Sequence, residues 1–109
     1  MENLKKILKY KKEILLFCFV FISIFFTIIV KPIADLDELW NYNVARAIST
    51  GLIPYKDISM ITTPLLPIIA SVFLKVIANE VIVTRILASL IGTTIILYIY
   101  KIFSKLLKE

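Results

Sequence analysis

Four acidic residues near the middle of the chain are the strongest candidates for chemistry. Asp35, Asp37 and Glu38 fall within four positions, and Asp57 follows further along. A carboxylate held at the edge of apolar surroundings can serve as a general base. Asp35 and Glu38 also have the spacing of a capping box, at the N-cap and third helical positions of a helix. Asp37 has no capping role in that arrangement, so it is the better candidate for a base.

Other kinds of catalytic group are scarce. The chain has no histidine and a single cysteine, Cys18, which lies inside an apolar run. This excludes histidine-activated serine or cysteine nucleophiles, a disulfide framework and most zinc sites. Acid–base chemistry must therefore use carboxylates, lysines or tyrosines. The acidic residues could instead ligate a divalent metal ion, and the sequence leaves that alternative open.

The composition places these acids in a membrane protein. Of the 109 residues, 60% are hydrophobic and 19% are charged, which is too apolar for a small soluble domain or a disordered chain. The net charge of +5 comes from the ends, since residues 1–13 hold five lysines and residues 101–109 hold three. Basic ends around an apolar body are typical of membrane topology signals. No basic face interleaved with aromatic residues is present, so we expect no nucleic-acid partner.

Two apolar segments are predicted to cross the bilayer. Residues 14–30 are uncharged over 17 positions, and residues 81–100 form the second candidate. The first segment follows a lysine-rich head as a signal peptide would. Its apolar core is longer than usual and no small-residue cleavage site follows, which predicts an uncleaved anchor. Gly92 in the second segment is expected to let another helix approach closely.

The connection between the two spans is predicted to hold two helices at the membrane surface. The first covers about 36–50, with Asp35 as its N-cap, Gly51 just past its end and an apolar face of Trp40, Val44, Ala47 and Ile48. The second covers about 64–78, starts with Pro64 and Pro67 in its first turn, and carries a polar stripe of Ser71, Lys75 and Asn79.

The expected fold is therefore an all-α membrane protein, with two transmembrane helices flanking an extracytoplasmic loop that holds two juxtamembrane helices. Retention of lysine in the cytoplasm puts the basic head (1–13) and the basic tail (101–109) inside and residues 31–80 outside the plasma membrane. The alternative is three spans, with the helix at 64–78 as an additional crossing and the tail outside.

Four sequence elements occur in an order that resembles a known family. They are DELWNYNVAR at 37–46, GLIPYKD at 51–57, TTPL at 62–65 and VTRILASLIG at 83–92. In this order they resemble the N-terminal part of polytopic glycosyltransferases of the GT-C superfamily, such as protein O-mannosyltransferases and aminoarabinose transferases. The resemblance extends from the first span to Lys105.

The resemblance implies transfer of a sugar, with inversion, from a polyprenyl-phosphate-linked donor to an acceptor hydroxyl. It places Asp37 as the catalytic carboxylate and Glu38 as its companion. Charge for the donor phosphate is expected from Arg46, Lys56 or Arg85. Aminoarabinose-type enzymes carry Glu-Lys-Pro where this chain has Thr62-Thr63-Pro64, so Thr63 can donate a hydrogen bond there but brings no charge.

Complete enzymes of this kind have many more spans than two. The sequence therefore predicts a truncated module that is inactive alone, or one half of an enzyme completed by a downstream chain. A different interpretation is a small non-enzymatic membrane hairpin that partners a larger complex. A third is a membrane-permeabilising peptide, against which the organised acidic loop argues.

Overall fold

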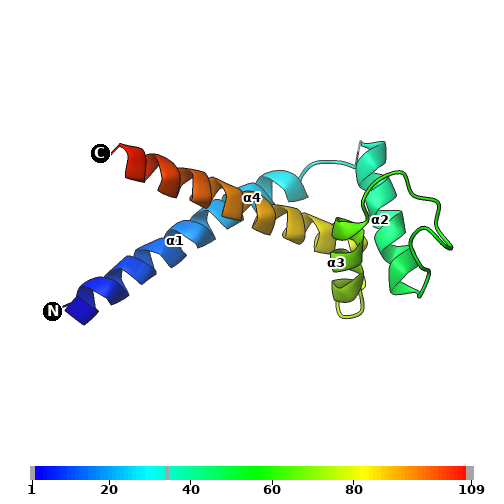
Figure 1. The fold of residues 1–109 in the computed structure, drawn as a ribbon, viewed down its shortest axis with the longest axis horizontal. Helices are drawn as coiled ribbons and strands as arrows, with labels where there is room; N and C mark the ends of the chain where they lie inside the picture. Colours follow the sequence, from blue (N-terminus) through cyan, green and yellow to red (C-terminus); the bar gives the residue numbers. More distant parts are fainter. Residues whose placement is uncertain (1, 34, 108–109) are drawn as a thin grey trace. The chain divides into compact units, whose positions relative to one another are not determined.

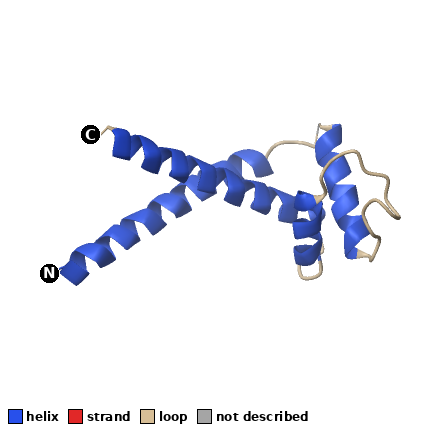
Figure 2. Ribbon diagram, viewed as in Figure 1, coloured by secondary structure: helices blue, strands red, loops and turns tan. Residues whose placement is uncertain are grey.

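The computed structural model describes residues 2–33 and 35–107, and these form four α-helices and no strand (Figures 1 and 2). They are α1 (Glu2–Ile29), α2 (Leu36–Ser49), α3 (Leu65–Leu74) and α4 (Glu80–Leu106). The predicted all-α class is confirmed. The chain forms two compact units. We call Met1–Val30 with Ala88–Glu109 the hairpin unit, and Lys31–Leu87 the loop unit.

Two of the described helices are long and apolar enough to cross a membrane. The candidate spans are Asn3–Ile29 within α1 and Glu80–Leu106, which is the whole of α4, and each has 27 residues. At 1.5 Å per residue this is about 40 Å. The ten-residue α3 is about 15 Å long, too short for the additional crossing in the three-span alternative.

The lysine-rich head is part of the first helix. The predicted anchor began at residue 14, whereas α1 begins at Glu2. Lysine, leucine and glutamate are strong helix formers, and neither glycine nor proline occurs before Pro32. The helix therefore continues through the change from charged to apolar sequence.

Within the hairpin unit, α1 and the later part of α4 run antiparallel. Glu13 lies beside Lys101, with 3.6 Å between Oε2 and Nζ, and Ile24 lies beside Gly92. Residue numbers thus rise along one helix as they fall along the other. A methyl group built on Gly92 would lie 3.7 Å from Cδ1 of Ile24. The helices do approach at Gly92 as predicted, but at this distance an alanine would fit as well.

The ends of α2 follow the local sequence signals. The carboxylate of Asp35 accepts a hydrogen bond of 3.1 Å from the amide of Asp37, which confirms Asp35 as the N-cap. At the other end Gly51 has a φ of +105°. Its amide donates to the carbonyl of Ile48, and that of Leu52 donates to Ala47, which completes a Schellman motif.

Small side chains form the centre of the loop unit. Ala45 of α2, Ala70 of α3 and Val83 of α4 are buried against one another, and α2 and α3 lie side by side (Figure 1). The predicted apolar face of α2 is confirmed, since Val44 is buried and Trp40, Ala47 and Ile48 are half-buried. The most buried positions are Tyr42, Val44 and Ala45, because the tyrosine hydroxyl finds polar partners and the alanine admits a close neighbour.

The second loop helix is shorter than predicted. Pro64 is its N-cap and Pro67 stands in its first turn, but α3 begins at Leu65 rather than 64 and ends at Leu74 rather than 78. The predicted polar stripe is therefore wrong. The Ser71 side chain is buried and its hydroxyl donates to the carbonyl of Ile68. Asn79 instead caps α4, since its side-chain oxygen accepts a 3.0 Å hydrogen bond from the amide of Ile82.

Candidate functional site

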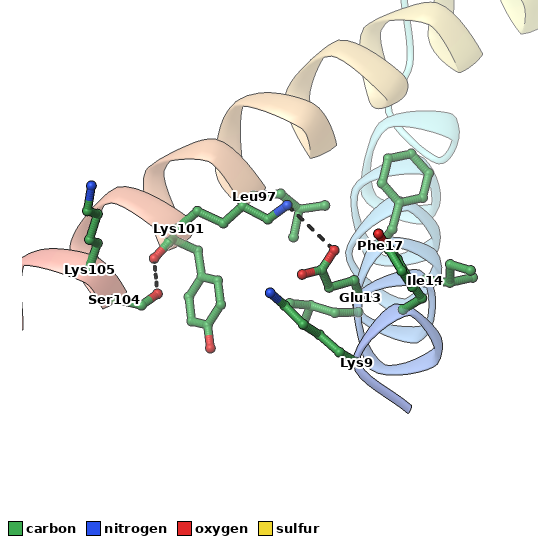
Figure 3. A pocket seen from close by; sticks show the side chains of 11 residues that line it. Lys9, Glu13, Ile14, Phe17, Leu97, Lys101, Ser104 and Lys105 are labelled. Atoms are coloured by element: carbon green, nitrogen blue, oxygen red, sulfur yellow. Dashed lines mark hydrogen bonds and ion pairs between the residues drawn. The ribbon is translucent and has the colours of Figure 1, made fainter. Parts of the chain in front are cut away.

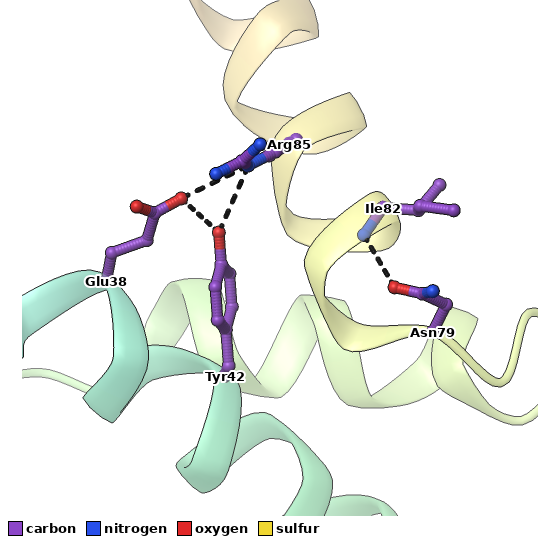
Figure 4. A network of polar contacts seen from close by, with 5 residues as sticks. All are labelled: Glu38, Tyr42, Asn79, Ile82 and Arg85. Carbon is purple, nitrogen blue, oxygen red and sulfur yellow. Dashed lines mark hydrogen bonds and ion pairs between the residues drawn. The ribbon is translucent and has the colours of Figure 1, made fainter. Parts of the chain in front are cut away.

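Three polar side chains meet inside the loop unit (Figure 4). The Nε of Arg85 donates to Oε1 of Glu38 at 3.3 Å and to the Tyr42 hydroxyl at 3.4 Å. The hydroxyl of Tyr42 in turn donates to the same carboxylate oxygen of Glu38. We call these three residues the Glu38 triad. They pair one carboxylate with one guanidinium, so the cluster is neutral.

Helix geometry explains why the triad forms. Glu38 and Tyr42 are four residues apart on α2, so they share one face. Arg85 lies in the second turn of α4, 47 residues beyond Glu38, two residues after Val83, which shares a buried cluster with Ala45 of α2. The Arg85 side chain is 5% exposed and that of Glu38 is 29% exposed. A guanidinium this deeply buried needs the carboxylate beside it.

The predicted role of Glu38 in a capping box is therefore wrong. Its carboxylate bonds to Tyr42 and Arg85, and Asp35 caps the helix through the amide of Asp37. A buried guanidinium and a phenol compete more strongly for the carboxylate than an exposed backbone amide does.

Tyr42 gives this cluster a measurable pH signature. Burial, and next the hydrogen bond to Glu38, raise the pKa of Tyr42 above its usual value of 10.0, while the hydrogen bond from Arg85 opposes the rise. Because the folded-state pKa of Tyr42 is raised, the contribution of its protonated hydroxyl to stability is not reduced by Tyr42 ionisation below about pH 10 and is lost as the pH rises through the folded-state pKa. The measurement is the absorbance of tyrosinate as the pH is raised, for wild type and for Tyr42→Phe. The difference between the two curves reports the ionisation of Tyr42, and we expect its midpoint above pH 10. A midpoint at or below 10 would contradict the buried, Glu38-bonded hydroxyl.

Asp37, the neighbour of Glu38, takes no part in this cluster and lines a different feature. It is exposed and borders an open cavity of about 570 Å³, which we call the Asp37 groove. The other residues that line the groove are Trp40, Asn41, Ser59, Ile61 and Thr62. Neither of the carboxylate oxygens of Asp37 has a hydrogen-bond partner within residues 2–33 and 35–107. An indole ring, an amide and an open carboxylate together can hold a polyhydroxylated ligand and accept a proton from it.

The far wall of the groove comes from the connection between α2 and α3. A turn at residues 55–57 is held by Asp57, whose carboxylate accepts a 2.9 Å hydrogen bond from the amide of Ile53. Tyr55 has a φ of +64°, and its hydroxyl donates to the carbonyl of Thr62 at 3.1 Å. These bonds fix the segment that carries Ser59, Ile61 and Thr62. Asp57 thus serves the turn rather than the groove.

The residues predicted to contact a donor phosphate have different surroundings. Arg85 belongs to the Glu38 triad, and Arg46 pairs with Glu80 at 3.4 Å while its side chain remains 71% exposed. Lys56 and Thr63 are exposed on the connection between α2 and α3. Arg46 and Lys56 are accessible cations, whereas Arg85 already has its anionic partner.

Two polar residues of the loop unit were not predicted from the sequence to belong to its buried part. Tyr42 was not considered as a polar group, although its spacing of four from Glu38 was a usable signal. Thr84 is buried, and its hydroxyl has no hydrogen-bond partner among the described residues. No sequence pattern marks that position.

The sequence left open a site for a divalent metal ion, and the described part of the chain can be searched for its ligands. No group of three or more histidine, cysteine, aspartate or glutamate side chains comes together there. Of the two adjacent acids, Glu38 is engaged with Arg85 while Asp37 faces the groove. The arrangement suits a carboxylate that acts as a base.

Comparison of the chain with protein-family models, with curated proteins and with solved structures finds no match.

Proposed function

We propose that this chain is the N-terminal module of a membrane glycosyltransferase that takes its sugar from a polyprenyl-phosphate-linked donor. The observation that carries the proposal is that two adjacent acids have different surroundings. Asp37 offers an open carboxylate beside Trp40 and Asn41, while Glu38 is held by Arg85 and Tyr42. A base must be open to the acceptor hydroxyl, and Asp37 meets that condition because its carboxylate is exposed, whereas the carboxylate of Glu38 is already bonded to Arg85 and Tyr42.

In the proposed reaction the acceptor hydroxyl is held in the Asp37 groove. Its oxygen attacks the anomeric carbon of the sugar as the carboxylate of Asp37 removes its proton. The bond between that carbon and the phosphate oxygen breaks, and the lipid phosphate leaves with the electron pair. Attack from the face opposite the leaving group inverts the anomeric centre. Arg46 and Lys56 are the accessible cations of the loop unit that could offset the charge of the phosphate.

Glu38 is a positioning residue in this proposal. It joins the first turn of α2 to the start of α4 through Arg85, and Asp37 is its neighbour in that turn. A fixed first turn keeps the carboxylate of Asp37 on the groove side of the helix. Positional precision of this kind matters because small displacements of a catalytic group lower the rate strongly.

The proposed location is the plasma membrane, with both termini in the cytoplasm and the loop unit outside. Support comes from the antiparallel pairing of α1 and α4, in which Glu13 lies beside Lys101, because it puts both lysine-rich ends at the same end of the hairpin unit. The positive-inside rule then selects the cytoplasm for that end.

The test combines location with activity. The chain is co-expressed with a candidate downstream chain. Membranes that contain both proteins are supplied with a polyprenyl-phosphate sugar, and transfer of the sugar to an acceptor is measured. We expect transfer, and we expect a cysteine at Thr50 to react with a membrane-impermeant thiol reagent from outside. Labelling only from the cytoplasmic side would contradict the proposal, because the donor would then be on the wrong side of the bilayer.

A second function remains compatible with one specific observation. The face of α3 that carries Val72, Phe73 and the following Val76 is exposed and apolar, as expected for a surface that meets lipid or another protein. A non-enzymatic hairpin that partners a larger membrane complex would use such a face. Absence of transfer together with stable co-purification of one membrane protein would favour this alternative.

A further inference from the structure

A second cavity lies in the hairpin unit, at the lysine-rich ends of its two helices (Figure 3). It has a volume of about 730 Å³ and lies between residues 9–17 of α1 and 97–105 of α4. Three lysines, Lys9, Lys101 and Lys105, line it together with a single acid, Glu13. The lining therefore has an excess of positive charge, which favours an anionic ligand.

The one ion pair in this cavity is weak enough to be exchanged. Nζ of Lys101 lies 3.6 Å from Oε2 of Glu13, and their side chains are 60% and 40% exposed. Solvent-exposed pairs of this kind contribute little to stability. No carboxylate of the described residues lies within 4.0 Å of the amino groups of Lys9 and Lys105. A phosphate can therefore bind to these lysines with little competition from the protein's own acids.

The walls of the cavity change from polar to apolar along the helices. The lysines lie toward the chain ends, while Ile14, Leu16, Phe17 and Leu97 lie toward the middle of the apolar stretches. A neighbouring cavity of about 460 Å³ shares Lys9 and Glu13 and adds Lys5 and Lys12. A ligand that fits must carry a negative head and an apolar body, and a membrane phospholipid has both.

We propose that this cavity binds an anionic membrane lipid, with the lipid phosphate held by Lys9, Lys101 and Lys105 and an acyl chain lying against Phe17 and Leu97. A soluble phosphate would meet the same lysines but would gain nothing from the apolar wall. The site is separate from the Asp37 groove, and the proposal does not depend on the transferase activity.

The test titrates the full chain in neutral detergent micelles with phosphatidylglycerol, phosphatidylcholine or inorganic phosphate, and counts bound molecules by native mass spectrometry. The test variant is the double substitution Lys9→Gln and Lys101→Gln. The matched control is Lys6→Gln and Lys11→Gln, which removes the same charge from lysines that line neither cavity. Circular dichroism checks that all variants remain helical.

We expect wild type to bind phosphatidylglycerol more tightly than phosphatidylcholine. We expect the test variant to lose about fivefold in affinity for phosphatidylglycerol per lysine removed, and the control to retain most of it. Glu13→Gln should bind phosphatidylglycerol more tightly than wild type, because it removes the competing carboxylate. Equal losses in the test and control variants, or no preference for the anionic lipid, would overturn the proposal. Equally tight binding of inorganic phosphate would also overturn it, since the apolar wall would then have no role.

Discussion

Replacing Asp37 with asparagine is expected to lower sugar transfer by the reconstituted enzyme about 10²–10⁴-fold, the usual contribution of a general base. Asparagine keeps the size of the side chain but cannot accept the proton of the acceptor hydroxyl. Asp37 is exposed and lies beside its groove rather than in the buried core, so the loop unit should stay folded. The measurement is the initial rate of transfer at saturating donor, with circular dichroism of the same samples.

Asp57→Asn is the matched control for this substitution. Asp57 is also an exposed aspartate of the loop unit, and its carboxylate accepts a hydrogen bond from the amide of Ile53. Asparagine can accept that bond through its amide oxygen, so transfer should change by less than a few fold. If Asp37→Asn kept full activity, Asp37 would not be the base and the proposed mechanism would fail.

Glu38→Gln separates a base from a positioning residue. Its carboxylate is bonded to Tyr42 and Arg85, so the substitution should reduce the stability of the loop unit together with the rate of transfer. Asp37→Asn should reduce the rate alone. The reverse pattern, with a stable but inactive Glu38→Gln protein, would move the role of base from Asp37 to Glu38.

Local signals made α2 predictable. Asp35 supplies the N-cap acceptor and Gly51 adopts the positive φ that ends the helix, and both act within a few residues of the ends they define. The predicted range of 36–50 therefore differs from the observed Leu36–Ser49 by one residue. Helix ends set by caps are readable from sequence because the partners are neighbours in the chain.

The end of α3 was not predictable in the same way. A helical period through Ser71, Lys75 and Asn79 is present in the sequence, but Asn79 is used as the cap of α4. The chain must also turn between the two helices, and residues 75–79 make that turn. Where a residue can serve either the end of one helix or the start of the next, periodicity alone does not decide.

The candidate site was predictable in its exposed part and not in its buried part. Asp37 could be singled out because the cap left it without a local role. Arg85 could not be predicted as the partner of Glu38, because the two residues are 47 positions apart in the chain. The resemblance suggested instead that Arg85 contacts the donor phosphate. A contact of that separation depends on how α2 packs against α4, which no local pattern specifies.

Arg85→Met is expected to destabilise the loop unit by about 3 kcal/mol, the lower end of the range for removing one partner of a buried ion pair. Methionine fills much of the same space but leaves the carboxylate of Glu38 without its cation. The lower end applies because the Glu38 side chain is still 29% exposed, so water can solvate part of the carboxylate. Trp40 is the single tryptophan of the chain and lies on α2, so its fluorescence during unfolding reports on the loop unit alone.

Arg46→Met is the matched control, because Arg46 pairs with Glu80 at a similar distance of 3.4 Å but is 71% exposed. An exposed pair contributes about 0–1 kcal/mol, so the two arginine variants should differ by about 2 kcal/mol or more. Adding Glu38→Gln to Arg85→Met should recover part of the loss, since the uncompensated charge is then removed. Equal stability of the two single variants would show that the pair of Arg85 with Glu38 does not hold the loop unit together.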